Sequence, residues 1–213
     1  MVRRAMATIP NFDLETAVRL AGARNVAGVD EVGRGPWAGP VVAAAVILDP
    51  QAIPDGLNDS KQLSAKRRAD LANQLQDCAQ IGIGQASVAE IDDLNILRAS
   101  HLAMERAVAA LPTAPDHVLV DGNQIPRGLN HRCDAVVKGD SISVSIAAAS
   151  IVAKIWRDRL MVDLAQQHPG YGWDTNAGYG TKLHQDGLRK FGVTPHHRRS
   201  FKPIHKILYQ EKS

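Results

Sequence analysis

The sequence predicts an α/β fold: a mixed β-sheet flanked by helices, with a C-terminal helical extension. Strand-like segments come first, and strands then alternate with helix-like segments, which is typical of a sheet covered on both faces. The run 41–48 is apolar without a break, as expected of a strand that is buried on both sides. No Pro- or Ser-rich linker divides the 213 residues. We therefore expect a single domain over residues 1–213.

The individual elements follow from hydrophobic spacing and from the residues at their ends. Leu14, Val18 and Ala21 share one face of the first helix, and Ser64 can cap the second. The longest helix is rich in Ala and apolar on most sides near its start, so its first half should be buried. We expect helices over 13–23, 64–78, 96–111 and 142–166, and strands over 26–30, 41–48, 81–88, 117–121 and 135–138.

Composition excludes several classes of protein. With 45% apolar residues, the chain can bury a core and is not expected to be disordered. Its longest apolar run is far short of the ~20 residues of a membrane helix. No apolar stretch follows Arg3 and Arg4, so no signal peptide is expected. Cys78 and Cys133 form no motif and are interpreted as reduced thiols. We expect a cytoplasmic monomer that does not contact a membrane.

Charge is distributed unevenly along the chain. Residues 182–213 carry eight Lys or Arg against two acids, which is +6, so residues 1–181 carry −3 of the total of +3. We interpret this segment as a basic surface for a polyanion, the alternative being a solvated helix without a partner. Its histidines lack the Cys or carboxylate companions of a zinc site and are counted with the basic surface. A helix with Ile204, Ile207 and Leu208 could dock a protein partner, although ordinary packing explains it more simply.

Four acids stand where an expected strand meets a glycine-marked turn: Asp30, Glu31, Asp121 and Asp140. Sites assemble at such strand ends. At ~5 Å and an effective dielectric constant of ~20, each pair of carboxylates would repel by roughly 3 kcal/mol. Raised pKa values or bound cations relieve such repulsion, and four carboxylates match the charge of two Mg²⁺ or Mn²⁺ ions. Taken singly, each acid is an ordinary turn or surface residue.

One objection concerns Asp30 and Glu31. Neighbouring residues on a regular strand point to opposite faces of the sheet, so both reach one site only if the strand is distorted. Gly28 and Gly33 flank the pair and would allow such a distortion.

Three glycine- or polar-rich segments have the composition of ligand-binding loops. Gly33–Arg34–Gly35 lets a ligand approach backbone amides and offers a guanidinium for phosphate. Lys61 lies just before an expected helix N-terminus, where a phosphate can be held. Tyr179 stands between two glycines and could stack on a sugar or base. Each segment alone is also explained by a tight turn.

Taken together, these segments resemble bacterial ribonuclease HII, a member of the type 2 ribonuclease H family. The resemblance extends in a fixed order from about Ala27 to Phe201, which is nearly the whole chain. It is carried by residues 28–36, 39–42, 59–63, 120–123, 138–140, 145–151, 178–181 with His184, 197–198 and 200–201.

The resemblance implies a ribonuclease H-like fold and an endonuclease that cuts the RNA strand of RNA–DNA hybrids. It also implies cleavage 5′ to single ribonucleotides in duplex DNA, with two divalent cations, Mn²⁺ or Mg²⁺, leaving 3′-hydroxyl and 5′-phosphate ends. By this analogy the four acids bind metal and are catalytic. Gly33, Arg34 and Gly35 would contact the ribose 2′-hydroxyl through the backbone, Tyr179 would stack on the neighbouring deoxyribose, and Lys61 would contact a phosphate.

Two residues depart from the family pattern. Ala177 stands where the family often has Lys, which puts a phosphate contact in doubt. Gly187 stands where the family often has Ala within a helix, at an expected cost of up to about 1 kcal/mol.

Two rival functions remain open at this point. A DNA junction nuclease of the same fold would ignore the 2′-hydroxyl, which makes the Gly-Arg-Gly segment beside the acids hard to explain. A hybrid-binding module without catalysis would gain nothing from four acids next to phosphates.

Overall fold

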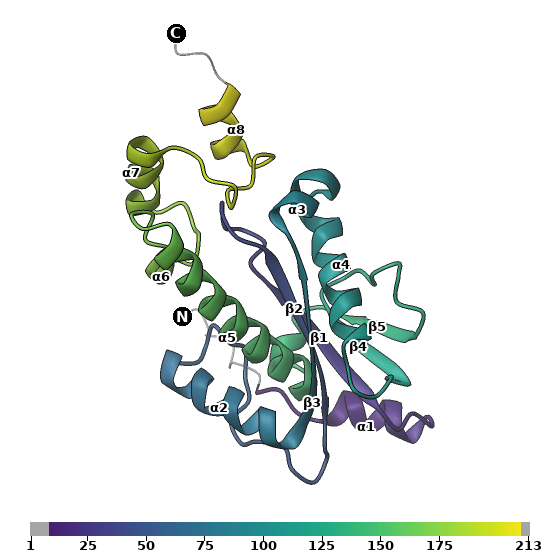
Figure 1. The fold of residues 1–213 in the computed structure, drawn as a ribbon. Helices are drawn as coiled ribbons and strands as arrows, with labels where there is room; N and C mark the ends of the chain where they lie inside the picture. The colour runs from purple at the N-terminus through teal and green to yellow at the C-terminus, as the bar shows by residue number, and fades with distance from the viewer. Residues whose placement is uncertain (1–8, 210–213) are drawn as a thin grey trace, which may run out of the picture.

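A five-stranded sheet forms the centre of the computed structural model, which describes residues 9–209 (Figure 1). The strand order is β3-β2-β1-β4-β5. β2 pairs antiparallel with β1 and β3, whereas β4 pairs parallel with β1 and with β5. The expected mixed sheet is therefore confirmed. Its strands are β1 (Val26–Val32), β2 (Val41–Leu48), β3 (Ala79–Ala86), β4 (His117–Asp121) and β5 (Arg132–Val136).

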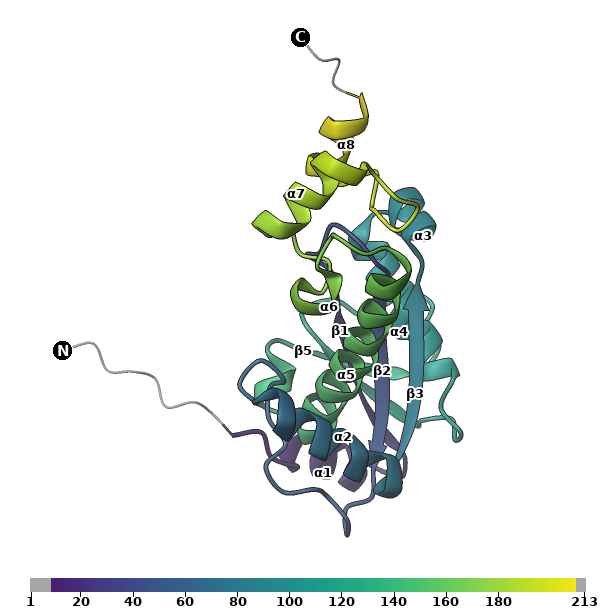
Figure 2. The same ribbon diagram turned by 60° about the vertical axis from the view of Figure 1, so that its left-hand side comes forward.

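Helices cover both faces of this sheet. α5 and α2 lie on one face, and α4 lies on the other (Figures 1 and 2). A short 3₁₀ turn, η1 (Gly139–Ser141), leads into α5. The helices are α1 (Asp13–Leu20), α2 (Ala65–Cys78), α3 (Val88–Leu94), α4 (Ile96–Ala109), α5 (Val144–Gln167), α6 (Trp173–Asn176), α7 (Lys182–Phe191) and α8 (Lys202–Tyr209).

β2 is buried along its whole length, as its unbroken apolar run predicts. Alternate residues enter two different cores: Val41 and Ala43 pack with α4, and Ala44 and Val46 pack with α5. Small side chains on β2 and along the first half of α5 let the helix lie close to the sheet. The expected burial of the first half of α5 is confirmed.

Several expected boundaries differ from the structure, most clearly at β3 and β5. The strand expected over 81–88 ends at Ala86, because Ser87 caps α3 and forms a capping box with Glu90. This helix was not expected, although the Ser-x-x-Glu spacing signals it. The strand expected over 135–138 is β5, which begins earlier and ends at Val136. Lys138 has φ +56° and leads into η1 instead.

The C-terminal part packs around a core of its own beyond one end of the sheet (Figure 2). Trp173, Leu188 and Ile204 are buried there together with Ala38 from the loop between β1 and β2. Ile204 is thus a core residue, Leu208 is partly buried, and of the proposed docking residues only Ile207 is exposed, at 50%. Residues 210–213 lie outside the described part of the chain. Within residues 9–209, no helix has both the length and the hydropathy that crossing a bilayer would require.

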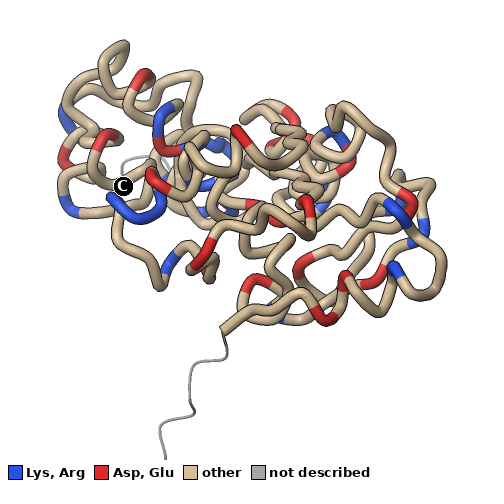
Figure 3. The backbone as a smooth tube through the Cα atoms, turned by 90° about the horizontal axis from the view of Figure 1, so that it is seen from below, with Lys and Arg blue, Asp and Glu red and all other residues tan. Residues whose placement is uncertain are grey.

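Lys and Arg positions are frequent near the C-terminal end of the molecule, with acids between them (Figure 3). Lys182, Arg189 and Lys190 are exposed on α7, and the first two pair with Asp186. Some basic residues of the segment 182–213, however, are buried. Arg198, His184 and His197 are buried, so the interpretation of these three residues as part of a basic surface is wrong.

Candidate active site

The parallel pairing of β1 and β4 brings two of the acids to the same edge of the sheet. That pairing ends with Val29 opposite Val120. Asp30 and Asp121 are the next residues of the two strands, at their carboxyl ends. This is the edge where ligand sites form in open α/β sheets, because the strand ends are fixed while the groups beyond them are accessible.

Asp30, Glu31 and Asp121 form one cluster. Each of the three offers a carboxylate oxygen, and these oxygens all lie within 4.8 Å of one another. The objection that a regular strand would separate Asp30 from Glu31 does not hold. Oδ1 of Asp30 accepts the N–H of the next residue, Glu31, at 2.7 Å.

The flanking glycines have other roles than the expected distortion. β1 stays paired with β2 as far as Val32. A Cβ on Gly28 would lie 2.2 Å from the backbone carbonyl carbon of Ser145, so this glycine lets α5 approach the sheet. Gly33 has φ +93°, and a Cβ there would lie 2.2 Å from Nε of Arg157. Both positions are fixed by close packing of their neighbours.

Asp140 lies beside this cluster on η1. The Gly139 N–H donates to Oδ1 of Asp121 at 2.7 Å, which ties the turn to the end of β4. Nζ of Lys61 lies 3.8 Å from Oδ2 of Asp140 and 3.8 Å from Oδ1 of Asp59. The structure therefore brings the four predicted acids and Lys61 together. It adds Asp59, which the sequence analysis did not select although it stands in the same segment as Lys61.

The pKa values of these carboxyl groups show how much negative charge is gathered here. Burial, followed by the charges of Glu31 and Asp121, raises the pKa of Asp30 well above its usual value. Burial also raises the pKa of Asp121 and of Asp140, and the charge of Asp59 adds to the shift at Asp140. Burial alone would lower the pKa of Lys61, but Asp59 and Asp140 raise it. A cluster of carboxylate oxygens with so little compensating charge suits hard divalent cations.

The Gly33–Arg34–Gly35 loop lies directly next to the acids. Nη1 of Arg34 is 3.2 Å from Oε1 of Glu31. A Cβ on Gly35 would lie 3.2 Å from Cε1 of Tyr179, so the Tyr179 ring stands against this glycine. The ring itself is 52% exposed and is free to meet a ligand. The predicted substrate-contacting residues are therefore neighbours of one another and of the acids.

A buried arginine from the C-terminal segment holds this loop. The guanidinium of Arg198 donates to the carbonyls of Gly33 at 2.6 Å, Arg34 at 2.9 Å and Gly39 at 2.9 Å. Burial lowers the pKa of Arg198 to about 9, so the group remains charged at neutral pH. Three backbone carbonyls thus replace the water that Arg198 loses. The sequence analysis counted Arg198 as basic surface, and only the fold shows what it binds.

A second buried arginine, Arg157 of α5, joins this loop to the segment that carries Tyr179. Its guanidinium donates to the carbonyls of Pro40 at 3.1 Å, Ala38 at 3.2 Å and Ala177 at 3.0 Å. Burial lowers the pKa of Arg157 to about 10. The bond to Ala177 uses its backbone carbonyl, so the absence of a lysine side chain there leaves the hold on this segment unchanged.

Two buried histidines support the same segment. Thr194 N–H donates to Nδ1 of His197 at 2.9 Å, and the two Nε2 atoms of His197 and His184 are 3.0 Å apart. Nδ1 of His184 lies 2.9 Å from the carbonyl oxygen of Tyr179. These partners fit neutral rings in which His197 donates to His184 and His184 donates to Tyr179. Burial lowers the pKa of His184, and burial together with His184 lowers that of His197 to about 3.

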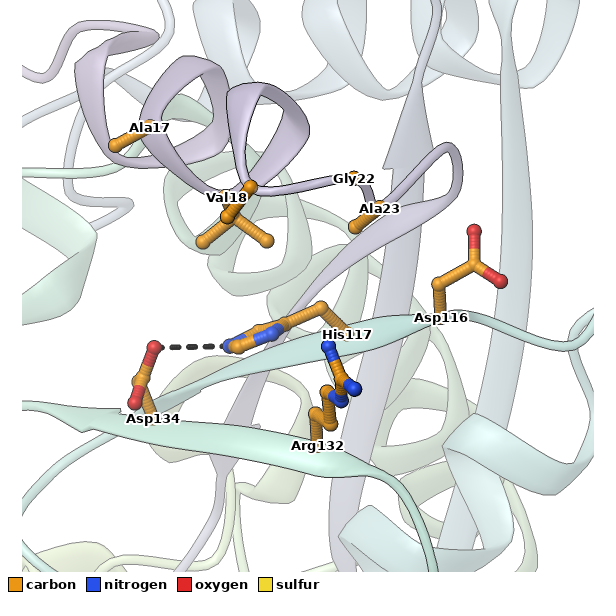
Figure 4. Close-up of a pocket in the computed structure, with 9 residues that line it drawn as sticks. Ala17, Val18, Gly22, Ala23, Asp116, His117, Arg132 and Asp134 are labelled. Carbon is orange, nitrogen blue, oxygen red and sulfur yellow. Dashed lines mark hydrogen bonds and ion pairs between the residues drawn. The ribbon is translucent and has the colours of Figure 1, made fainter.

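A cavity of about 590 Å³ lies at the other edge of the sheet, next to α1 (Figure 4). Nε2 of His117 lies 2.8 Å from Oδ2 of Asp134 in it. Asp116 already accepts the N–H groups of Arg24 and Asn25. The two carboxylates that line this cavity, Asp116 and Asp134, thus already have partners. The candidate site is therefore the acidic edge, by which we mean the sheet end that carries Asp30, Glu31, Asp121 and Asp140.

Comparison with known proteins agrees with this geometry. The family model described as ribonuclease HII matches residues 27–204. A curated ribonuclease HII of Ruegeria pomeroyi is 70% identical over 204 residues, which cover 96% of this chain and 87% of the relative. This chain belongs to the ribonuclease HII family. It is therefore a nuclease of the ribonuclease H type, which confirms the resemblance seen in the sequence.

Solved structures share the fold of this ribonuclease HII family member. Ribonuclease H2 of Pyrococcus horikoshii matches with a TM-score of 0.72 and 29% identity, covering 86% of this chain and 97% of that chain. A ribonuclease HII of Archaeoglobus fulgidus, solved in a complex with PCNA, matches with a TM-score of 0.73 and 25% identity over 84% of this chain and 96% of that one. The expected ribonuclease H-like fold is confirmed.

Gly187, which departs from the family pattern, has a packing reason in this chain. A Cβ there would lie 2.6 Å from the carbonyl oxygen of Gly170 and 3.0 Å from Cδ1 of Tyr171. The glycine lets α7 approach the segment before α6, so its cost to the helix is offset by close packing.

Proposed function

We propose that this member of the ribonuclease HII family hydrolyses the RNA strand of RNA–DNA hybrids and cuts 5′ to single ribonucleotides in duplex DNA. Water attacks the phosphorus, the bond from phosphorus to the 3′-oxygen breaks, and the products carry 3′-hydroxyl and 5′-phosphate ends. The observation that carries the proposal is the position of the Gly33–Arg34–Gly35 loop. It adjoins a cluster of carboxylates on one side and the exposed Tyr179 ring on the other.

The four acids fit divalent cations. Asp30, Glu31 and Asp121 offer oxygens within 4.8 Å of one another, and Asp140 lies alongside. We assign metal binding and catalysis to these four residues, with two Mn²⁺ or Mg²⁺ ions as cofactors. When bound, such ions supply a nucleophilic hydroxide and stabilise the departing oxygen. The carboxylates are held in place by the Glu31 N–H on Asp30 and the Gly139 N–H on Asp121.

The loop is suited to recognise a 2′-hydroxyl. Its carbonyls at Gly33 and Arg34 accept bonds from Arg198. The N–H groups of Arg34 and Gly35 donate to no acceptor within residues 9–209, so they remain available to a substrate oxygen. Since the 2′-hydroxyl distinguishes RNA from DNA, donors fixed this close to the acids would select the ribonucleotide.

The remaining contacts would bind the sugar and phosphate groups of the nucleic acid and would not read its base sequence. Tyr179 would stack on the deoxyribose next to the ribonucleotide. Lys61, 79% exposed at the edge of the acidic cluster, would contact a phosphate. Arg189 and Lys190 on α7 are exposed on the same C-terminal part and would add contacts to the backbone. Docking of a partner protein on α8 remains a prediction, and Ile207 is the exposed apolar side chain of α8 that would contact it.

The test is cleavage of a labelled DNA duplex that contains one ribonucleotide, in Mn²⁺, in Mg²⁺ and with chelator. An all-DNA duplex of the same sequence and an RNA–DNA hybrid are run beside it. We expect a metal-dependent cut 5′ to the ribonucleotide, cleavage of the hybrid and none of the all-DNA duplex. Cleavage of both duplexes would favour the DNA nuclease, and binding without cleavage in either metal would favour the hybrid-binding module.

A further inference from the structure

We propose that Glu15 is a positioning residue for the acidic site. Its buried carboxylate, on α1, fixes the start of α5 and thereby the turn that carries Asp140. The inference rests on the proposed function, because that function gives Asp140 its role. Glu15 itself contacts none of the four acids; it acts through the backbone that holds them.

The carboxylate of Glu15 is fully buried at the N-terminus of α5. Its Oε1 accepts the hydroxyl of Ser143, which is the N-cap residue of α5, and the N–H of Ser145 at 3.0 Å. A carboxylate at this place is favoured by the positive end of a helix of 24 residues. Burying it without partners would be costly, so the two bonds fix α1 against the start of α5. Oε2 and the Ser145 hydroxyl are buried and have no hydrogen-bond partner within residues 9–209.

The backbone around Ser143 is held from the same side. The Asn11 N–H donates to the carbonyl of Ile142 at 3.0 Å, and the Val144 N–H donates to the carbonyl of Asn11 at 3.1 Å. The segment before α1 therefore pairs with the chain on both sides of Ser143. Together with Glu15, it leaves the junction between η1 and α5 little freedom.

Two routes lead from this junction to the acids. In the first, the Ser143 N–H donates to the carbonyl of Gly139 at 2.8 Å, and the Gly139 N–H donates to Asp121. Asp140 lies between these two bonded residues. A shift of Ser143 is therefore passed to Asp140 and to Asp121 together.

The second route is direct packing on β1. Gly28 leaves only enough room for the backbone of Ser145, because a Cβ there would lie 2.2 Å from its carbonyl carbon. Gly28 stands two residues before Asp30 on the same strand. The Ser145 N–H that Glu15 holds thus belongs to the turn of α5 that rests on the strand of Asp30 and Glu31.

α1 lies before the part of the chain that the family model matches. The ribonuclease HII model begins to match at residue 27, whereas Glu15 precedes it. The family motifs supply the acids, and in this chain a residue before those motifs supplies the carboxylate that holds their support. No motif in the sequence marks Glu15, because its partners lie 128 and 130 residues away.

Three substitutions separate positioning from other effects. Glu15→Ala removes the acceptor, Glu15→Asp shortens its reach, and Glu15→Gln keeps an acceptor oxygen of the same length. Asp116→Ala is the control, because Asp116 also accepts two hydrogen bonds, in its case from the backbone N–H groups of Arg24 and Asn25. Asp116 lies just before β4, at the end of that strand away from Asp121 (Figure 4). Each full-length variant is measured for kcat and KM on the single-ribonucleotide duplex. Calorimetric titration with Mn²⁺, without substrate, gives a second readout, and the Tm monitors folding.

We expect Glu15→Ala to lower kcat and to weaken Mn²⁺ binding by about 10-fold each, with KM unchanged, as is typical when a group behind a metal ligand is lost. Glu15→Asp should lose less, and Glu15→Gln and Asp116→Ala should stay within about 2-fold of wild type. If Glu15→Ala does not fold, the kcat and Mn²⁺ affinity of Glu15→Asp test the proposal instead.

Folded variants with wild-type kcat and Mn²⁺ affinity would overturn the role of Glu15. A folded Glu15→Gln that loses as much as Glu15→Ala would also overturn it, because the acceptor oxygen would then not be what matters. If wild type does not cleave at the ribonucleotide, the proposed function fails, and the Mn²⁺ titration still tests Glu15.

Discussion

At the scale of single residues, two of the four acids are oriented by backbone N–H groups. Asp30 accepts the N–H of Glu31, and Asp121 accepts that of Gly139. These bonds use one oxygen of each carboxylate and leave the other for a ligand. The residue types at the strand ends predicted the cluster, but the sequence did not reveal which bonds orient it.

Asp121→Asn should abolish cleavage, lowering kcat by at least about 100-fold, because the amide has no charge to hold a cation. The Asn oxygen can still accept the Gly139 N–H, so the fold and the substrate Kd should be retained. Cleavage and binding of the single-ribonucleotide duplex measure both, with Asp116→Asn as the control. Equal turnover by Asp121→Asn and wild type in matched metal would remove Asp121 from the site.

Gly35→Ala should reduce the preference for a ribonucleotide more than Arg34→Ala does. The added Cβ would lie 3.2 Å from the Tyr179 ring and would crowd the backbone N–H groups that we assign to the 2′-hydroxyl. Losing one such bond in a dry site costs about 1–3 kcal/mol, or roughly 5- to 150-fold in kcat/KM. Competition between ribonucleotide-containing and all-DNA duplexes for binding, together with kcat/KM, measures the preference. The opposite order would indicate recognition by the Arg34 side chain.

At the scale of elements, the loops of the site depend on buried arginines from distant parts of the chain. Arg198 comes from the segment between α7 and α8 and binds the loop after β1. Arg157 comes from α5 and binds both that loop and Ala177. Each guanidinium donates to three backbone carbonyls, so one side chain fixes several turns of backbone at once.

Arg198→Lys should raise KM for the single-ribonucleotide duplex by about 10-fold and destabilise the fold by roughly 2 kcal/mol. A lysine has the charge but not the fork, so it cannot reach the carbonyls of Gly33, Arg34 and Gly39 together. The neighbouring Arg199 is exposed, which makes Arg199→Lys the matched control. Steady-state kinetics and denaturant unfolding give the two values, and identical behaviour of both variants would contradict this role of Arg198.

At the scale of the whole molecule, the C-terminal part is an integral support of the acidic edge. Its core includes Ala38, which lies in the loop that Arg157 and Arg198 hold. The neutral pair of His184 and His197 connects the same part to the carbonyl of Tyr179. Because this support requires neutral rings, the stability of the molecule should depend on pH.

The pKa of His197 is about 3 in the folded protein, below its ordinary value of 6.5. The unfolded chain therefore binds more protons than the folded protein between these values, and stability is lost as pH falls below about 6.5. From pH 7.5 to 5.0, this group should cost about 2 kcal/mol of unfolding free energy. His197→Gln should be less stable at pH 7.5 but should lose less on acidification. Denaturant unfolding of wild type and His197→Gln without metal, at pH 7.5 and 5.0, measures the loss of unfolding free energy in each. His205→Gln is the control at an exposed histidine. Equal losses in wild type and His197→Gln would contradict this role of His197.

Local patterns in the sequence predicted the fold class, the buried strand β2 and the acids that the structure brings together. These depend on local patterns: apolar spacing, glycines at strand ends and motifs in a fixed order. The tertiary structure decided what holds the site, because Glu15, Arg157, Arg198 and His197 act on residues far away in the chain. The sequence does not distinguish a buried charged residue from an exposed one of the same type. Only packing, which removes water and supplies backbone partners, distinguishes the Arg198 that supports the site from the Arg199 beside it.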